Sequence, residues 1–260
     1  MTTRLLGRLL GVTAMLALFL PGCSHQQAPR QENESPPKQE TIYFHVDPAT
    51  AGAISGTIHF AGRQPARKVI DMSEDPACVS AHNGKQYDED LTVGQQSAVA
   101  DVFVYVEKGL EGKRFEPPAS DVILKQTGCW FVPRVLGLQT GQALEIINSD
   151  PLTHNIHPMP RANHEWNHSQ APGDPPFRRQ FTQPEVMIPI KCKIHNWMHA
   201  YLGVIDHPYF AVTDNSGKFE LTNLPPGSYT IAAWQESLGM LRQTITIKPG
   251  GHSDVRFTFK

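Results

Sequence analysis

The ten residues 191–200, KCKIHNWMHA, constrain this chain more than any other stretch. Cys192, His195 and Met198 follow one another at intervals of three residues, and the apolar runs on either side, VMIPI and YLGVI, predict two strands. A tight loop between those strands would bring the three side chains to one point. Thiolate, imidazole and a weak thioether, completed by a second imidazole, form a ligand set that suits copper. The pattern therefore predicts most of a copper site.

Residues 141–157, GQALEIINSDPLTHNIH, offer the second imidazole. Apolar side chains alternate through 143–147 and predict a strand, which the turn signal NSDP ends. His154 and Asn155 follow this turn, on a predicted loop. We expect a neighbouring strand to bring this loop beside Cys192.

The two segments resemble the blue-copper cupredoxins, most closely the amicyanin-like and plastocyanin-like members. The Cys-x-x-His-x-x-Met spacing and the histidine followed by asparagine carry the resemblance, which covers residues 121–207. It implies a Greek-key cupredoxin β-sandwich that holds one type 1 copper ion. The alternative for the loop motif alone is that its Cys, His and Met are ordinary core residues. The order and context of the two segments favour the metal.

The resemblance also implies a role for each matching residue. The implied copper ligands are His154, Cys192, His195 and Met198. Asn155 is implied to tie the two ligand loops together and to hydrogen-bond toward the thiolate, which would tune the redox potential. His195, on a loop expected to be exposed, is implied as the route by which the electron enters and leaves.

Short alternating strands with turn signals between them recur outside this region and predict an all-β chain. The C-terminal stretch VTDNSGKFELTNLPPGSYTIAAW resembles the transthyretin-like (prealbumin-like), carboxypeptidase-regulatory-like domains, and the earlier ISGTI resembles their first strand. We predict that residues 51–110 and 208–260 form one such β-sandwich, into which the cupredoxin domain, 121–207, is inserted. The alternative is two consecutive domains, with the first strands added to the cupredoxin sheet.

The first residues predict export. Arg4 and Arg8 precede an apolar stretch that is too short to span a bilayer, so residues 1–22 are predicted as a signal peptide. The ending LPGC resembles the bacterial lipobox and implies a lipidated Cys23; a plain cleaved signal is the alternative. The polar residues 23–45 are predicted to be a flexible tether. We expect a lipid-anchored protein of the cell envelope, at the outer membrane and facing the periplasm.

Cysteine usage predicts one disulfide. With Cys23 assigned to lipid and Cys192 to copper, Cys78 and Cys129 remain of the four cysteines. Export implies an oxidising compartment in which a disulfide persists, so we predict that these two pair. The alternative takes Cys78-x-x-x-His82 as half of a second metal site.

Two long polar stretches, 73–96 and 158–179, are predicted to be loops. Three histidines lie in or beside the second stretch: His157, His164 and His168. They are either ligands of a second ion or, as we favour, solvated side chains.

The charge balance excludes nucleic acid as an expected partner. The net charge is −2, and loss of the two arginines with the signal would make it −2 − 2 = −4. We predict a single-electron carrier rather than an enzyme, working with a redox partner protein such as a cytochrome c or an oxidoreductase and held at the membrane by its lipid. The alternatives are a periplasmic copper-delivery protein and an envelope interaction module that uses the transthyretin-like sandwich.

Overall fold

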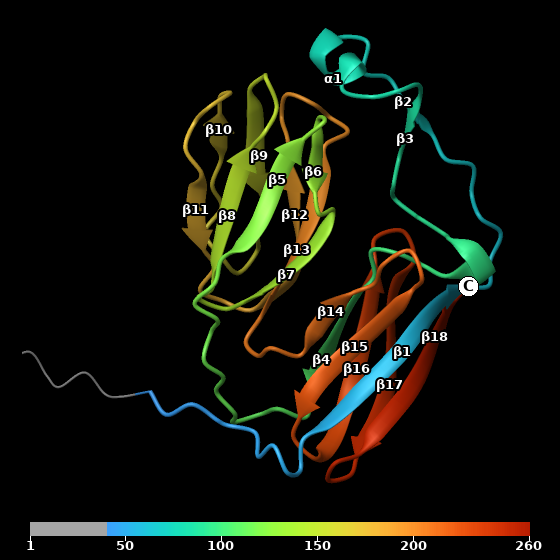
Figure 1. The fold of residues 1–260 in the computed structure, drawn as a ribbon, viewed down its shortest axis with the longest axis vertical. Helices are drawn as coiled ribbons and strands as arrows, with labels where there is room; N and C mark the ends of the chain where they lie inside the picture. Colours follow the sequence, from blue (N-terminus) through green and yellow to red (C-terminus); the bar gives the residue numbers. More distant parts are fainter. Residues whose placement is uncertain (1–40) are drawn as a thin grey trace, which may run out of the picture. The chain divides into compact units, whose positions relative to one another are not determined.

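The structure is a computed structural model that describes residues 41–260. The predicted signal, the lipidation of Cys23 and most of the predicted tether lie outside these residues. The regular secondary structure of the described part is almost wholly β-strand, which confirms the all-β prediction (Figure 1). None of the helices between residues 41 and 260 is long and apolar enough to cross a bilayer.

One pair of sheets combines strands from the two ends of the described chain. Their strand orders are β15-β1-β18 and β14-β4-β16-β17. The strands are β1 (Gly52–Phe60), β4 (Phe103–Lys108), β14 (Phe210–Val212), β15 (Lys218–Leu224), β16 (Gly227–Gln235), β17 (Gly239–Ile247) and β18 (His252–Phe259). Strand β1 runs parallel to β18 and antiparallel to β15. Alternate side chains of β1, among them Ile54 and Ile58, are fully buried in one apolar core with Tyr229 and Phe257.

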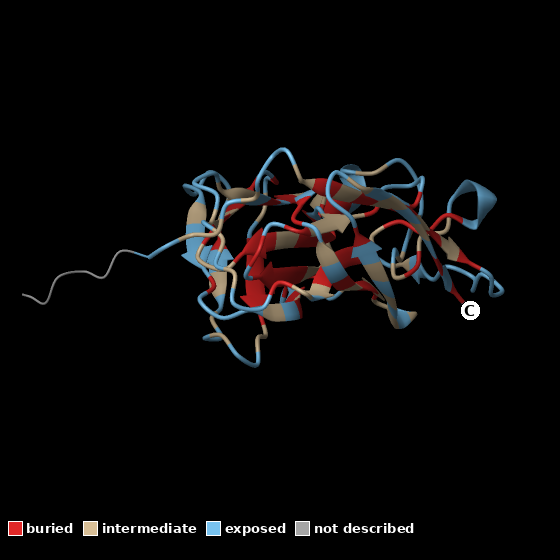
Figure 2. Ribbon diagram, turned by 90° about the horizontal axis from the view of Figure 1, so that it is seen from below, coloured by how far each residue is buried: buried red, intermediate tan, exposed pale blue. Residues whose placement is uncertain are grey.

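The other pair of sheets lies between these strands in the sequence. Its strand orders are β10-β9-β12-β13-β7 and β11-β8-β5-β6. The strands are β5 (Val122–Thr127), β6 (Trp130–Val132), β7 (Val135–Gln139), β8 (Ala143–Asn148), β9 (His154–Pro158), β10 (His168–Gln170), β11 (Phe177–Gln180), β12 (Glu185–Lys191) and β13 (His199–Ile205). Side chains from both sheets, such as Leu124, Ile146, Ile156 and Leu202, form its core, so this pair is a second sandwich. Figure 2 shows the buried residues of the chain in red along the strands.

A smaller apolar cluster joins the two sandwiches. Gly137 of β7 and Gly203 of β13 lie opposite each other in the parallel pair. A Cβ atom at Gly203 would lie 2.4 Å from the ring of Phe103, and one at Gly137 would lie 2.6 Å from the ring of Phe210. The two glycines are therefore required where the stacked rings of Phe103 and Phe210 rest on the second sandwich.

Neither long polar stretch is a plain loop, so that prediction was wrong. The stretch 73–96 contains the helix α1 (Pro76–Ser80), the strand β3 (Gln86–Tyr87), which pairs with β2 (Val69–Ile70), and most of the 3₁₀ turn η1 (Gln95–Ser97). Helix α1 forms because Asp75 caps it and Pro76 occupies its first turn. The stretch 158–179 contains β10 and most of β11.

Candidate metal centre

The predicted strand–loop–strand unit is present. Strand β12 ends at Lys191 and pairs with His199, the first residue of β13. The loop between them is closed by its own backbone: the amide of Cys192 donates to the carbonyl of Met198 at 3.0 Å, and the amide of Met198 donates to the carbonyl of His195 at 3.0 Å. These bonds place Cys192 and Met198 side by side and fold the His195 segment over them.

His154 reaches this loop through strand pairing. It is the first residue of β9 rather than part of a loop, which corrects the prediction. Strand β9 pairs with β12, so that His157 lies opposite Lys191. Because the pair is antiparallel, the start of β9 lies beside the end of β12, next to Cys192.

Three donor atoms converge between the two segments. The two Nδ1 atoms of His154 and His195 are 3.0 Å apart, and Sγ of Cys192 lies 3.8 Å from Nδ1 of His195. The ligand-type atoms of all three residues lie within 4.8 Å of one another. We call these three residues the sulfur–imidazole cluster. It is enclosed, with exposed fractions of 0% for His154, 4% for Cys192 and 2% for His195. Met198, fully buried, belongs to the same apolar core as Cys192.

The sulfur of Cys192 accepts two backbone hydrogen bonds from its own loop. The amides of Ile194 and His195 each donate to Sγ at 3.4 Å. Hydrogen bonds to a ligand sulfur lower its electron donation to a metal. The loop therefore supplies these contacts to the sulfur without help from another element.

Asn155 fulfils half of its expected role. Its Oδ1 accepts from the amide of Lys193 at 3.1 Å, which ties β9 to the Cys192 loop as expected. Its Nδ2 donates to Asn167 and to the carbonyl of His168, so the expected hydrogen bond toward the thiolate was wrong. The backbone amides near Cys192 supply that contact instead.

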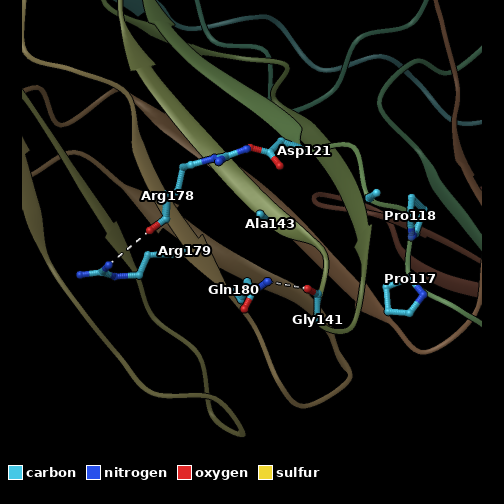
Figure 3. Close-up of a pocket in the computed structure, with 9 residues that line it drawn as sticks. Pro117, Pro118, Asp121, Gly141, Ala143, Arg178, Arg179 and Gln180 are labelled. Carbon is cyan, nitrogen blue, oxygen red and sulfur yellow. Dashed lines mark hydrogen bonds and ion pairs between the residues drawn. The ribbon is translucent and has the colours of Figure 1, made fainter. Parts of the chain in front are cut away.

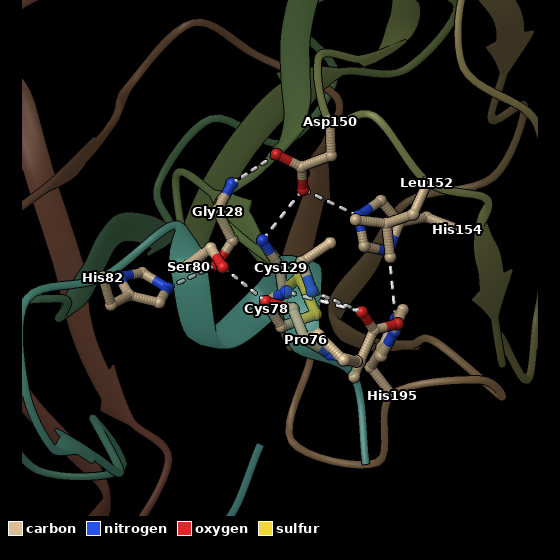
Figure 4. The surroundings of a disulfide bond; sticks show 12 residues. Pro76, Cys78, Ser80, His82, Gly128, Cys129, Asp150, Leu152, His154 and His195 are labelled. Atoms are coloured by element: carbon tan, nitrogen blue, oxygen red, sulfur yellow. Dashed lines mark hydrogen bonds and ion pairs between the residues drawn. A yellow bond between two sulfur atoms is a disulfide. The ribbon is translucent and has the colours of Figure 1, made fainter. Parts of the chain in front are cut away.

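The second ring nitrogen of each imidazole, Nε2, contacts a carboxylate. Nε2 of His154 lies 2.7 Å from Oδ2 of Asp150 (Figure 4). Nε2 of His195 lies 3.2 Å from Oδ2 of Asp75. Ionised carboxylates only accept, so these contacts assign the proton of each neutral ring to Nε2 and leave a lone pair on each Nδ1. Burial lowers the pKa of His154 and so favours its neutral form. The contact with Asp150 acts in the opposite direction but is the smaller effect. Sequence reasoning named neither aspartate.

The exposure expected for His195 was wrong. Its side chain is enclosed by Asp75, which arrives from the segment before α1, and by Trp197, whose ring centroid lies 5.2 Å away. The indole of Trp197 also donates to the carbonyl of Cys129 at 3.0 Å, which fixes the ligand loop against the turn between β5 and β6. The imidazole edge implied as the electron route is therefore covered by protein.

The predicted disulfide between Cys78 and Cys129 is present. It joins α1 to the turn between β5 and β6, and both cysteines are fully buried. The alternative of a half metal site at Cys78 and His82 is wrong, because Nε2 of His82 contacts the carbonyl of Gly128 at 2.6 Å. The disulfide sulfurs lie within 4.8 Å of a ring nitrogen of His195.

The three histidines of the long polar stretch do not form a site within the described chain. Nε2 of His157 contacts Glu165 at 2.6 Å, and the ring of His168 stacks on Phe177 at 3.7 Å. His164 is exposed. The side chains of these histidines do not converge, so the structure does not support the alternative that they bind a second ion.

A second group of ligand-type residues, Asp90, His199 and Glu236, surrounds the guanidinium of Arg134. We call these four residues the arginine cluster. Arg134 lies 3.0 Å from Asp90 and also contacts Glu236 and His199. Burial alone would raise the pKa of Glu236, but His199, Arg134 and Tyr201 outweigh it and lower the pKa to about 2. The cluster links the two sandwiches, because Arg134 precedes β7 and Glu236 follows β16.

A surface hollow lies at the opposite end of β5 and β8 (Figure 3). Its polar groups are engaged with one another: Arg178 pairs with Asp121, and the amide of Gln180 donates to the carbonyl of Gly141 at 2.9 Å. This hollow is separate from the sulfur–imidazole cluster.

Comparison with known proteins gives partial matches. The family model described as polysaccharide lyase family 4, domain II, matches residues 196–255, which begin in the ligand loop and run through most of the C-terminal strands. The transthyretin-like assignment of those strands stays a prediction. No curated protein matches the chain.

Similar solved structures include several cupredoxins. A copper-containing nitrite reductase from Thermus scotoductus is 22% identical over 38% of this chain, with a TM-score of 0.32, and the match spans 25% of the reductase chain. A purple cupredoxin from Nitrosopumilus maritimus is 21% identical over 32% of this chain and 99% of its own, with a TM-score of 0.28. A reduced amicyanin variant is 15% identical over 39% of this chain and 97% of its own, with a TM-score of 0.30. Because these scores are low, we rest the assignment of the site on its own side chains.

Proposed function

We propose that the chain binds one copper ion at the sulfur–imidazole cluster and carries single electrons. Cys192, His154, His195 and Met198 would hold the ion, and the thioether of Met198 would be the weakest of the four donors. One observation carries the proposal: two imidazole nitrogens with lone pairs face each other at 3.0 Å beside a cysteine sulfur. Two such lone pairs repel each other unless they share a cation.

The spacing of the donor atoms suits one shared ion. Transition metals are held at about 2.0 Å by imidazole nitrogen and about 2.3 Å by thiolate sulfur. The two Nδ1 atoms are 3.0 Å apart, and Sγ of Cys192 lies 3.8 Å from Nδ1 of His195. At these separations all three donor atoms can bind the same ion. Cys192 and Met198 belong to one apolar core and both imidazoles are buried, which would disfavour water as a competing ligand.

The chemistry of the donors favours copper over zinc. Structural zinc sites use four strong donors, whereas one thiolate, two imidazoles and a long thioether are typical of blue-copper electron-transfer sites. The ligands lie on paired strands and a backbone-closed loop, so little rearrangement is expected between the two oxidation states. When bound, the copper would supply the one-electron redox step.

This arrangement supports a carrier better than the two alternative functions. A delivery protein needs ligands that a partner can reach, whereas these donors are buried and His195 is covered by Asp75 and Trp197. An interaction module would not require buried metal-binding side chains. We therefore propose a non-enzymatic carrier that meets a redox partner protein, and we retain the lipid-anchored, envelope location as part of the proposal.

Metal analysis and visible spectroscopy test the proposal. The purified chain, loaded with Cu²⁺, is expected to bind one copper ion and to show an intense thiolate-to-copper absorption that a mild reductant bleaches and reoxidation restores. Cys192→Ser removes the sulfur and is expected to abolish the band. His157→Ala is the matched control, because it removes a buried histidine three residues from His154 and should leave the band unchanged. A colourless protein with copper present would refute the proposal.

An exchange assay separates a carrier from a delivery protein. The copper-loaded chain is mixed with a copper-free acceptor protein, and the visible band is followed with time. A carrier is expected to keep its band while still exchanging electrons with a redox partner. Rapid transfer of the ion without a change of oxidation state would favour delivery instead.

A further inference from the structure

We propose that Asp75 is a positioning residue for His195, supplied from outside the second sandwich and held in place by the Cys78–Cys129 disulfide. This inference rests on the proposed copper site and concerns how the chain orients one of its ligands. Asp75 lies 120 residues before His195 in the sequence. Asp75 lies immediately before α1, and α1 precedes every strand of the second sandwich in the sequence.

The two oxygens of Asp75 have separate tasks. Oδ1 accepts from the amides of Ala77 at 3.0 Å and Cys78 at 3.4 Å, as the N-cap of α1. Oδ2 is left to face Nε2 of His195 at 3.2 Å. Because the cap fixes the carboxylate, Oδ2 holds the proton of His195 on Nε2 and leaves the lone pair of Nδ1 toward Cys192 and His154.

The disulfide holds this carboxylate in place. Cys78, three residues after Asp75, is joined to Cys129 in the turn between β5 and β6. The amides of Gly128 and Cys129 donate to Asp150 at 2.6 and 2.8 Å, and Asp150 in turn contacts His154 (Figure 4). One covalently anchored turn thus supports the carboxylates of both imidazoles.

The arrangement has an electronic consequence. A carboxylate that accepts the Nε2 proton makes the imidazole a stronger donor, which favours Cu(II) over Cu(I). Loss of an outer hydrogen-bond partner of a metal ligand costs about tenfold or more in metal affinity. We expect Asp75→Asn to weaken Cu(II) binding about tenfold, which raises the reduction potential by about 59 mV if Cu(I) binding is unchanged.

The metal-free protein gives a sharper readout. The asparagine introduced by Asp75→Asn has one oxygen, which the amides of Ala77 and Cys78 occupy, so its NH₂ group faces His195. Nε2 must then accept, and the ring proton moves to Nδ1, the proposed ligand atom. Nitrogen NMR of the metal-free full chain is therefore expected to show His195 as the Nε2–H tautomer in the wild type and as the Nδ1–H tautomer in the variant.

Asp71→Asn is the matched control for the lost charge. Asp71 lies in the same segment, and its carboxylate accepts from the amide of Ser73 at 2.9 Å rather than from His195. This control is expected to keep the wild-type tautomer and potential. If Asp75→Asn does not fold, Asp75→Ser keeps a capping oxygen while removing the carboxylate, and a mixture of tautomers is expected.

The outcomes separate this inference from the proposed function. A wild-type tautomer and potential in both Asp75 variants would overturn the inference while copper binding stood. If the wild type takes up no copper, the proposed function fails, and a tautomer change in the metal-free variant would still support positioning by Asp75. An equal potential shift in Asp71→Asn would assign the effect to net charge and overturn the inference.

Discussion

The sulfur–imidazole cluster and the arginine cluster contain similar residue types but differ in what lies at their centre. In the arginine cluster the guanidinium of Arg134 already stands between Asp90, Glu236 and His199. In the sulfur–imidazole cluster no cationic side chain of residues 41–260 stands at the centre, and both imidazoles turn a lone pair inward, because the ring protons point outward to Asp75 and Asp150. His195 and His199, four residues apart, thus belong to different kinds of site. Convergence of ligand-type residues indicates a metal site only when no protein cation occupies the centre.

Removal of the Arg134 guanidinium from the arginine cluster should have the largest effect on stability. Arg134→Met leaves the carboxylates of Asp90 and Glu236, both partly exposed, beside each other without their cation. It is expected to lower the free energy of unfolding by about 3 kcal/mol, the low end of the range for a broken buried pair, because the Asp90 side chain is 37% exposed. Urea denaturation measures the loss. The double variant Arg134→Met/Glu236→Gln should recover part of it, and a cost below 1 kcal/mol for the single variant would show that the cluster is not the bridge that we describe.

Copper should stabilise the chain only through the sulfur–imidazole cluster. With free copper at 100 times the dissociation constant, the free energy of unfolding should rise by about 2.7 kcal/mol. Thermal melts with and without copper measure this gain, which should vanish in Cys192→Ser. An equal gain in the Cys192→Ser variant would place the ion elsewhere.

Acid should weaken the arginine cluster through Glu236. Its pKa is lowered from 4.5 to about 2 in the folded chain, so its stabilising contribution is complete above its unfolded pKa and is lost as the pH falls toward the folded one. Between pH 5 and pH 3 this residue should account for about 2 kcal/mol of lost stability. Urea denaturation at the two pH values measures the loss, and Glu236→Gln should show a loss smaller by that amount. An unchanged pH dependence would contradict the assignment.

The smallest effect is expected from His199. His199→Gln loses its contacts with the acidic side chains of the arginine cluster, at a cost of about 1 kcal/mol, and should leave the copper spectrum unchanged. His195→Gln is the counterpart and should abolish the spectrum. A changed spectrum in His199→Gln would mean that the two clusters are not independent.

The sequence by itself determined the all-β fold and the spacing of the ligand loop. Alternation of apolar side chains predicts strands because successive side chains point to opposite faces of a sheet. The three-residue steps from Cys192 to Met198 predict that these side chains lie close together, because a short turn between two strands leaves them little freedom. The pairing of Cys78 with Cys129 was predicted from the expected export and from the expected roles of the other two cysteines.

Only the tertiary structure decided what surrounds that loop. Asp75 meets His195 across 120 residues and Arg134 meets Glu236 across 102, and no local pattern records such contacts. The burial of His195, the pairing of β1 with β18 and the glycines beneath Phe103 depend equally on how distant strands pack. The physical reason is that the sequence specifies side-chain types and local periodicity, whereas the direction of each ring proton is set by the groups that distant segments bring within hydrogen-bonding distance.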